Sequence, residues 1–154
     1  MPVDEPILAK HPFFQGIDKK YIRDIAGHAK IAQFKEGDIL FREGGDADKF
    51  YLISKGKVAI EIFTPDRRVV PIQTVEDGEM LGWSWLAAPY KWRFDARALA
   101  KTEAIVLDGE TLRNQCEEDP RLGYELLKRI VQVFTRRLEQ TRLQMLDVYG
   151  KRPK

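Results

Sequence analysis

The sequence predicts a mainly β domain with helices at both ends, and three observations lead to this prediction. Short apolar runs recur at intervals of about ten residues between about residues 30 and 110, with glycines between them, which is typical of a small barrel or sandwich. Helical spacing of apolar residues precedes this region and returns after Pro120. We expect one domain over residues 1–154, with the barrel at about 30–110 and a long helix at about 120–148.

The composition fits a soluble globular protein, with 44% hydrophobic and 32% charged residues. No apolar run is long enough for a membrane span, and the first eleven residues lack the features of a signal peptide. The single cysteine, Cys116, has no internal partner, so we expect a half-buried thiol in a cytoplasmic protein.

Positive charge gathers at the C-terminal end of the chain. Residues 121–154 contain nine Lys and Arg against three Asp and Glu, although the net charge of the whole chain is only +2. A solvated helix face is the simplest interpretation, and an acidic partner or a nucleic acid is the alternative.

The N-terminal region predicts a turn followed by a short helix. Residues 6–15 read as a turn anchored by apolar side chains, and Asp18 is a suitable N-cap for a helix at about 19–28. His11 and His28 have no metal-ligating residue at a matching spacing, so no metal site is expected.

The middle of the chain predicts short strands joined by glycine-containing turns. Apolar residues alternate with polar ones in segments 31–34, 39–41, 50–53, 58–62, 69–75 and 98–107. We expect Gly37, Gly44, Gly56 and Gly78 at the corners, some with positive φ.

The long helix carries two apolar stripes. The residues at alternating spacings of four and three form a coiled-coil seam: Leu127, Val131, Phe134, Leu138, Thr141, Met145 and Val148. A second stripe, formed by Leu126, Ile130 and Val133, is limited to the first half. We expect the first half to pack on the barrel and the second half to form a parallel homodimer. The alternative is a helix that lies along its own barrel throughout.

Segment 78–98 holds all three tryptophans and predicts a ligand pocket. Gly82 stands where a strand-like run ends and a short helical turn begins, which leaves N–H groups for an anion, and arginines follow one loop later. The alternative is a tight turn with aromatic core residues.

Two segments resemble the cyclic nucleotide-binding domain shared by the catabolite activator protein, kinase regulatory subunits and gated channels. They are FKEGDILFREG at 34–44 and ADKFYLISKGKV at 47–58. FFQGI at 13–17 and RRLEQT at 136–141 are similar to the N-terminal segment and long helix of the bacterial activators. The resemblance covers nearly the whole chain. It implies a β-roll or jelly-roll barrel, flanked by short N-terminal helices and a long C-terminal dimerisation helix.

The resemblance also implies a ligand site with two changes. The family's pattern has a glycine and a glutamate at the start of a short helix, and the glutamate accepts from the ribose hydroxyl. An arginine on the following strand pairs with the cyclic phosphate. Gly82 keeps its place, but Trp83 stands at the glutamate position. The position of the family's arginine is ambiguous. Counting forward from Gly82 places Arg93 at this position, whereas counting back from residues 100–102, which resemble the end of the family's strand, places Phe94 at it.

Three outcomes are open for this site: altered cyclic nucleotide binding, a more aromatic or acidic ligand, or a collapsed pocket. We expect Arg93, in a strand bulge, to contact the anion, and Arg97 to be structural with Asp95 as the surface partner. Thr141 matches the helix position that reaches the base in the bacterial activators. The full set of candidate ligand-binding residues is Gly82, Trp83, Ser84, Trp85, Arg93, Phe94, Asp95, Arg97 and Thr141.

The function predicted from these features is a stand-alone regulatory sensor domain. A small anionic ligand, such as a cyclic nucleotide, would act through the long helix on a second copy or a protein partner. The alternative is a ligand-free dimeric scaffold. No cofactor and no enzyme activity are expected, because Ser84 lacks a base nearby and no phosphate-binding loop motif is present. The chain ends at Lys154, so we expect no DNA-binding domain within it.

Overall fold

The computed structural model describes residues 3–66 and 68–150, with side chains through residue 147. These residues form two four-stranded antiparallel sheets. The first has the order β1 (Lys30–Phe34), β8 (Thr102–Asp108), β3 (Lys49–Lys55), β6 (Met80–Leu81). The second has the order β2 (Ile39–Phe41), β7 (Asp95–Ala98), β4 (Lys57–Phe63), β5 (Val69–Glu76). The predicted mainly β jelly roll is therefore confirmed.

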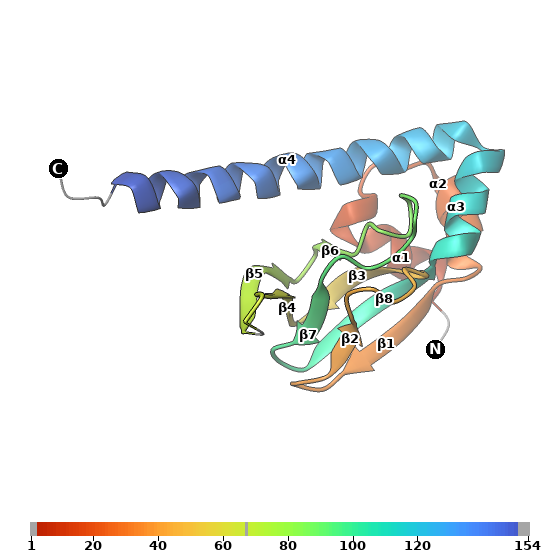
Figure 1. Cartoon of the computed structure of the whole chain (residues 1–154). Coiled ribbons are helices and arrows are strands. Elements are labelled where there is room, and N and C mark those ends of the chain that lie inside the picture. The colour runs from red at the N-terminus through yellow and green to blue at the C-terminus, as the bar shows by residue number, and fades with distance from the viewer. Residues whose placement is uncertain (1–2, 67, 151–154) are drawn as a thin grey trace.

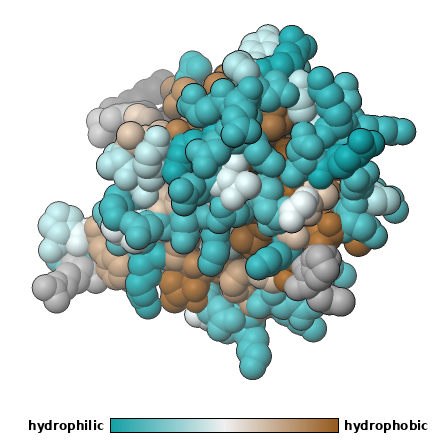
Figure 2. All heavy atoms as spheres, turned by 90° about the vertical axis from the view of Figure 1, so that its right-hand side faces the viewer, coloured by the Kyte–Doolittle hydropathy of each residue, from teal (hydrophilic) through white to brown (hydrophobic). Residues whose placement is uncertain are grey.

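Helices precede and follow the barrel. They are α1 (Glu5–Lys10), the 3-10 turn η1 (Pro12–Phe14), α2 (Lys19–Ala26), α3 (Gly109–Glu118) and α4 (Pro120–Gly150). The short helices and the first part of α4 lie at one end of the barrel, and α4 then runs past the β4–β5 hairpin (Figure 1). The end that carries α2 and α3 presents mostly hydrophilic residues, with small hydrophobic patches between them (Figure 2).

The spacing of residues did not predict the positions of α1 and α3, although the family resemblance implied short N-terminal helices. α1 forms where the sequence indicated only a turn, because the Asp4 carboxylate accepts a hydrogen bond from Ile7 N at 3.1 Å and caps the helix. α3 is capped in the same way by Asp108, which accepts from Thr111 N at 2.9 Å. The Asp18 cap of α2 is confirmed, with Lys20 N donating at 3.0 Å.

Two hydrophobic cores share strand β3. Its Phe50 and Leu52 pack with the helices, whereas Tyr51 and Ile53 point into the barrel. The helical core gathers apolar residues from every helix and includes Leu8, Phe14, Ile25, Trp85, Leu107, Leu112 and Leu126. The barrel core includes Phe41, Val58, Ile60, Val75, Leu81, Trp92, Phe94, Ala96 and Ala104. Both faces of β3 are therefore buried.

The predicted glycine corners are confirmed. Gly37, Gly44, Gly56 and Gly78 have φ values of 92°, 85°, 130° and 80° and lie at or beside turns between strands. The left-handed conformation at these corners lets short strands reverse without steric cost.

The two stripes of α4 behave differently. Leu126 and Ile130 are 1% and 3% exposed and Val133 packs beside them, which confirms that the first half of α4 lies on the domain. The described seam residues are exposed instead: Leu127, Val131, Phe134, Leu138, Thr141 and Met145. The side chain of Val148 lies outside the described residues. Within the described part of the chain, no helix is both long and apolar enough to cross a membrane.

Candidate functional site

Between β6 and β7 the chain forms no regular helix but two short turns, of which the first comes directly after Gly82. Leu86 N donates to Trp83 O at 3.1 Å, and Gly82 has a φ of 87°. Arg113 of α3 holds this turn from the side, since its Nη1 donates to Trp85 O at 2.5 Å. The guanidinium of Arg113 also lies 3.9 Å from the ring centroid of Tyr90.

A pocket of about 280 Å³ lies between this turn, strands β4 and β5, Phe94 just before β7, and helix α4. Its wall is mostly apolar and aromatic, with a few polar groups, and consists of Ile60, Ile72, Gln73, Trp83, Phe94, Phe134, Arg137, Leu138 and Thr141. Such a combination is characteristic of small-molecule sites. The sequence-predicted residues Trp83, Phe94 and Thr141 meet here, and we take this pocket as the candidate site.

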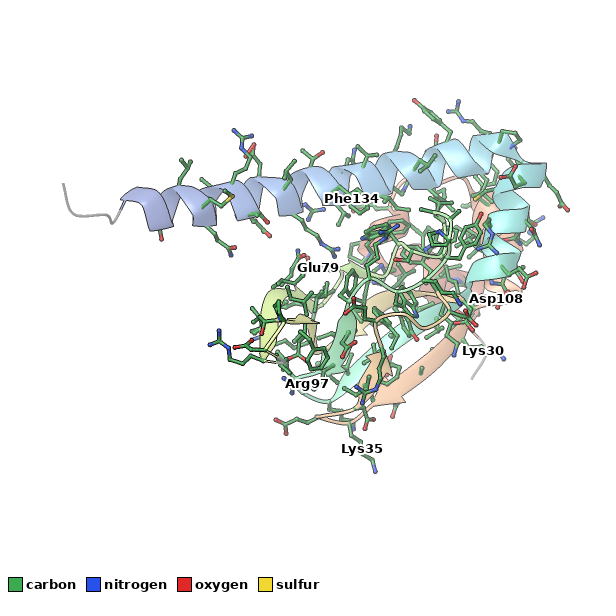
Figure 3. All side chains as sticks on the ribbon, viewed as in Figure 1. Lys30, Lys35, Glu79, Arg97, Asp108 and Phe134 are labelled. Atoms are coloured by element: carbon green, nitrogen blue, oxygen red, sulfur yellow. The ribbon has the colours of Figure 1, made fainter. Side chains whose placement is uncertain are left out.

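An aromatic contact joins the turn to α4 at this pocket. The rings of Trp83 and Phe134 meet edge to face, with centroids 5.4 Å apart and planes at 76°. Phe134 lies on the side of α4 that faces the barrel (Figure 3). Any ligand that separates these rings therefore also acts on α4.

The two candidate arginines lie outside the pocket wall. Arg93 is exposed in a bend before β7, not in a strand bulge, and its guanidinium lies 5.7 Å from the ring centroid of Trp83. Arg97 donates from Nε and Nη2 to the buried carboxylate of Glu61, at 3.1 and 2.7 Å. Figure 3 shows Arg97 well away from α4. Its interaction with the Glu61 carboxylate also raises the pKa of the Arg97 guanidinium, and the hydrogen bond is the largest cause.

The expected pairing of Asp95 with these arginines was wrong. Its carboxylate is buried, accepts from Glu43 N at 2.7 Å and lies 3.8 Å from Arg42 Nη1. The β2–β3 turn therefore covers Asp95, and the Arg97 side chain reaches diagonally across β4 to Glu61 instead.

Ser84 and Trp85 are also placed away from the pocket wall. Trp85 is fully buried in the helical core, with its ring centroid 5.2 Å from that of Phe50. Ser84 is 1% exposed. Among the described residues, neither Ser84 Oγ nor Trp85 Nε1 has a hydrogen-bond partner. The polypeptide folds Trp85 inward because its large apolar ring fills the space between β3 and α3.

Arg137 is the charged site residue that sequence reasoning missed, and the wall residues Ile60, Ile72 and Gln73 were not identified either. Arg137 Nη2 donates to Met80 O at 2.6 Å, while its Nε is buried without a partner among the described residues. Burial lowers the pKa of the Arg137 guanidinium, although Glu79 opposes this shift. In the sequence it stands beside Arg136 in a charged run, and nothing local distinguishes the two.

A larger hollow of about 610 Å³ lies under the first half of α4. Part of its charge is already paired, since Arg129 donates to Gln15 O and to Glu125 Oε2, both at 3.0 Å. Within the described residues, no group of three or more His, Cys, Asp or Glu is placed to hold a metal ion. Burial raises the pKa of the half-buried Cys116 thiol to about 11, which makes it a poor nucleophile.

Two antiparallel sheets in a jelly roll, followed by a long C-terminal helix that forms one wall of a pocket, define the fold class of this domain. The chain belongs to the cyclic nucleotide-binding domain family, whose model matches residues 31–119. This confirms the resemblance noted in the sequence.

Curated and structural relatives agree with this assignment. The chain is 27% identical over 144 residues to a CRP-like cAMP-activated global transcriptional regulator of Mycobacterium tuberculosis, covering 94% of this chain and 62% of that protein. The chain thus spans about three fifths of this relative's length. A candidate cyclic nucleotide-binding protein of Geobacter metallireducens has a similar structure, with a TM-score of 0.79, 26% identity and coverage of 88% of this chain and 98% of that one. The N-terminal domain of a Streptomyces coelicolor transcriptional regulator matches with a TM-score of 0.65 and 25% identity, covering 92% and 95%.

Proposed function

We propose that this domain is a regulatory sensor that binds a small anionic or aromatic ligand in the pocket under α4. The observation that carries the proposal is that α4 itself supplies Phe134, Leu138 and Thr141 to the pocket wall. A ligand seated there contacts the helix, so its affinity depends on how α4 packs. By the same linkage, ligand binding shifts the packing of α4, which a second copy or a protein partner can detect.

Cyclic nucleotides are the first ligands to test, because the family is named for them. We expect cyclic AMP to bind more weakly than it binds relatives that keep the glutamate. Trp83 cannot accept a hydrogen bond from a ribose hydroxyl, and a bond to a charged group contributes roughly 1.5–3 kcal/mol. Loss of this hydrogen bond lowers the affinity for the cyclic nucleotide by about 10- to 100-fold.

The proposal is tested by calorimetric titration with cyclic AMP and cyclic GMP, combined with amide hydrogen exchange of the bound protein. Binding should slow exchange in α4 around Phe134 to Thr141, whereas the doubly buried strand β3 should change little. A ligand that binds without altering exchange in α4 would contradict the relay. Mass spectrometry of small molecules that accompany the purified protein extends the search beyond nucleotides.

A ligand-free dimeric scaffold is the second candidate. Two observations favour it: the Trp83–Phe134 contact already occupies part of the pocket, and α4 exposes Leu138, Met145 and Leu146 by 62%, 54% and 65%. Exposed apolar residues in such a row are typical of a helix that pairs with another helix. A stable dimer that binds no small molecule at millimolar concentration would favour this function over the sensor.

A further inference from the structure

The pocket under α4 contains an unusual positive group. Arg137 is the charged residue among those described on the pocket wall, and it also faces the adjoining hollow between β5 and α4. One of its terminal nitrogens is held by Met80 O at 2.6 Å, which fixes the guanidinium in place. Its Nε is buried and has no partner among the described residues.

This arrangement is incomplete as an isolated structure. Among the described residues Arg137 forms no ion pair, and the carboxylate whose charge acts on its guanidinium is that of Glu79. A largely buried charge without a direct ion pair is destabilising, and a buried N–H without an acceptor adds to this cost. An anion that enters the pocket would supply a direct ion pair and the missing acceptor.

The rest of the wall selects for a flat apolar body. Trp83, Phe94 and Phe134 present aromatic rings, and Ile60, Ile72 and Leu138 add aliphatic surface. Gln73 and Thr141 supply the remaining polar groups, and the Thr141 hydroxyl already donates to Arg137 O at 3.0 Å. Among the lining residues no carboxylate is available to accept from sugar hydroxyls.

The size of the pocket sets a further limit. Its volume of about 280 Å³ lies just below the range of about 300–1,000 Å³ for sites that hold drug-sized ligands. One or two rings with a single charged substituent fit such a space, and one guanidinium balances one negative charge. From these observations we propose that Arg137 is the anion-binding group of this pocket and that the ligand is a small aromatic carboxylate.

This inference rests on the proposed sensor function and shifts its anion site from the loop before β7 to helix α4. A carboxylate held by Arg137 would press its ring between Trp83 and Phe134. The ligand would then bridge the turn and the helix, with its charge on α4 and its ring against both.

The test compares 2-naphthoate with its neutral amide, 2-naphthamide, by calorimetry and by quenching of tryptophan fluorescence. We expect the wild-type protein to bind the acid about tenfold or more tightly than the amide, since charge-assisted hydrogen bonds are involved. Arg137→Gln should remove this preference. Arg136→Gln is the matched control, because Arg136 is exposed on the same helix turn and is not part of this pocket. It should retain the preference.

Three results would overturn the inference: equal affinity for acid and amide, an unchanged preference in Arg137→Gln, or no binding of 2-naphthoate at millimolar concentration. If Arg137→Gln fails to fold, the acid-to-amide comparison on the wild-type protein still decides. If 2-naphthoate fails but cyclic AMP binds and slows exchange in α4, only this inference fails. If no small molecule binds, the sensor function fails with it.

Discussion

Gly82 and Trp92 lie so close together that a β-carbon added to Gly82 would be 2.8 Å from two carbons of the indole ring. Trp92 has little freedom to move away, because its ring stacks on Phe41 with centroids 3.8 Å apart and planes at 12°. Gly82 also has a φ of 87°. The sequence favoured Gly82 as an anion-binding position, and the structure adds two steric reasons for a glycine there.

Replacing Gly82 by alanine should therefore cost more than backbone strain alone. The left-handed conformation costs an alanine roughly 1–2 kcal/mol, and overpacking against the Trp92 ring adds about 1–3 kcal/mol. Gly37→Ala is the control, since Gly37 has a similar φ of 92° but a β-carbon there meets nothing within 4 Å. Urea unfolding gives the free energy of unfolding of both variants and of the wild type. Equal losses of stability in the two variants would show that the Trp92 ring moves aside freely.

Arg97→Ala should lower the melting temperature, whereas Arg93→Ala should change it little. The Glu61 side chain is 7% exposed, and Arg97 forms a bidentate pair with its carboxylate. Removing Arg97 leaves this buried charge unpaired, which is destabilising. Arg93 is exposed, and its guanidinium lies over the face of Trp83 at a distance typical of a weak cation–π pair. Differential scanning calorimetry compares the two, and a larger loss in Arg93→Ala would contradict these roles.

His11 should make stability depend on pH below neutrality. The ring is buried and neutral: Nε2 lies 2.9 Å from Ile53 O as donor, and Nδ1 accepts from Phe13 N at 3.2 Å. Burial lowers the pKa of His11 below its usual 6.5, despite the opposing bond to Ile53. The unfolded chain therefore takes up a proton first as the pH falls. This contribution to stability is complete above pH 6.5 and is lost as the pH falls towards the lowered pKa.

The free energy of unfolding measured from pH 8 to pH 5 checks this expectation. The slope due to one such histidine is at most about 1.4 kcal/mol per pH unit. His11→Gln should remove it while leaving the slopes of other groups in place. An identical pH profile in wild type and His11→Gln would rule out His11 as the source.

Met145→Asp should dissociate the homodimer proposed for the second half of α4. Met145 is 54% exposed, and a carboxylate buried in a helix seam would lack a partner. Because Met145 does not line the ligand pocket, the change separates pairing from ligand binding. Thr135→Asp, on another face of the same helix, is the control and should leave sedimentation unchanged. A wild-type protein that sediments as a monomer at micromolar concentration would argue against the dimer.

The barrel and the long helix were predictable because their signals are local. Alternating apolar residues and glycine corners mark each strand, and Pro120 with the apolar repeat marks α4. α3 was missed because few of its residues are apolar and only Gly109 and Leu112 are buried in it. α3 is stabilised by contacts with the turn after Gly82 and with α4. These contacts join residues that are distant in the chain, so a short stretch of sequence does not reveal them.

The site was only partly predictable for the same reason. Trp83 and Phe94 were found because their positions depart from a known pattern. Arg137 could not be distinguished from Arg136, since its partner, the Met80 carbonyl, is 57 residues away in the chain. Asp95 was assigned the wrong partners because its cover, the loop at Arg42 and Glu43, comes from another hairpin.

Strand β3 has a consequence for how the domain melts. Phe50 and Leu52 form part of the helical core, and Tyr51 and Ile53 form part of the barrel core, so each core loses a wall when the other opens. Partial unfolding of either layer would expose large apolar surface that has no alternative partner. The barrel and the helical layer are therefore expected to unfold in one cooperative transition, with equal calorimetric and van't Hoff enthalpies.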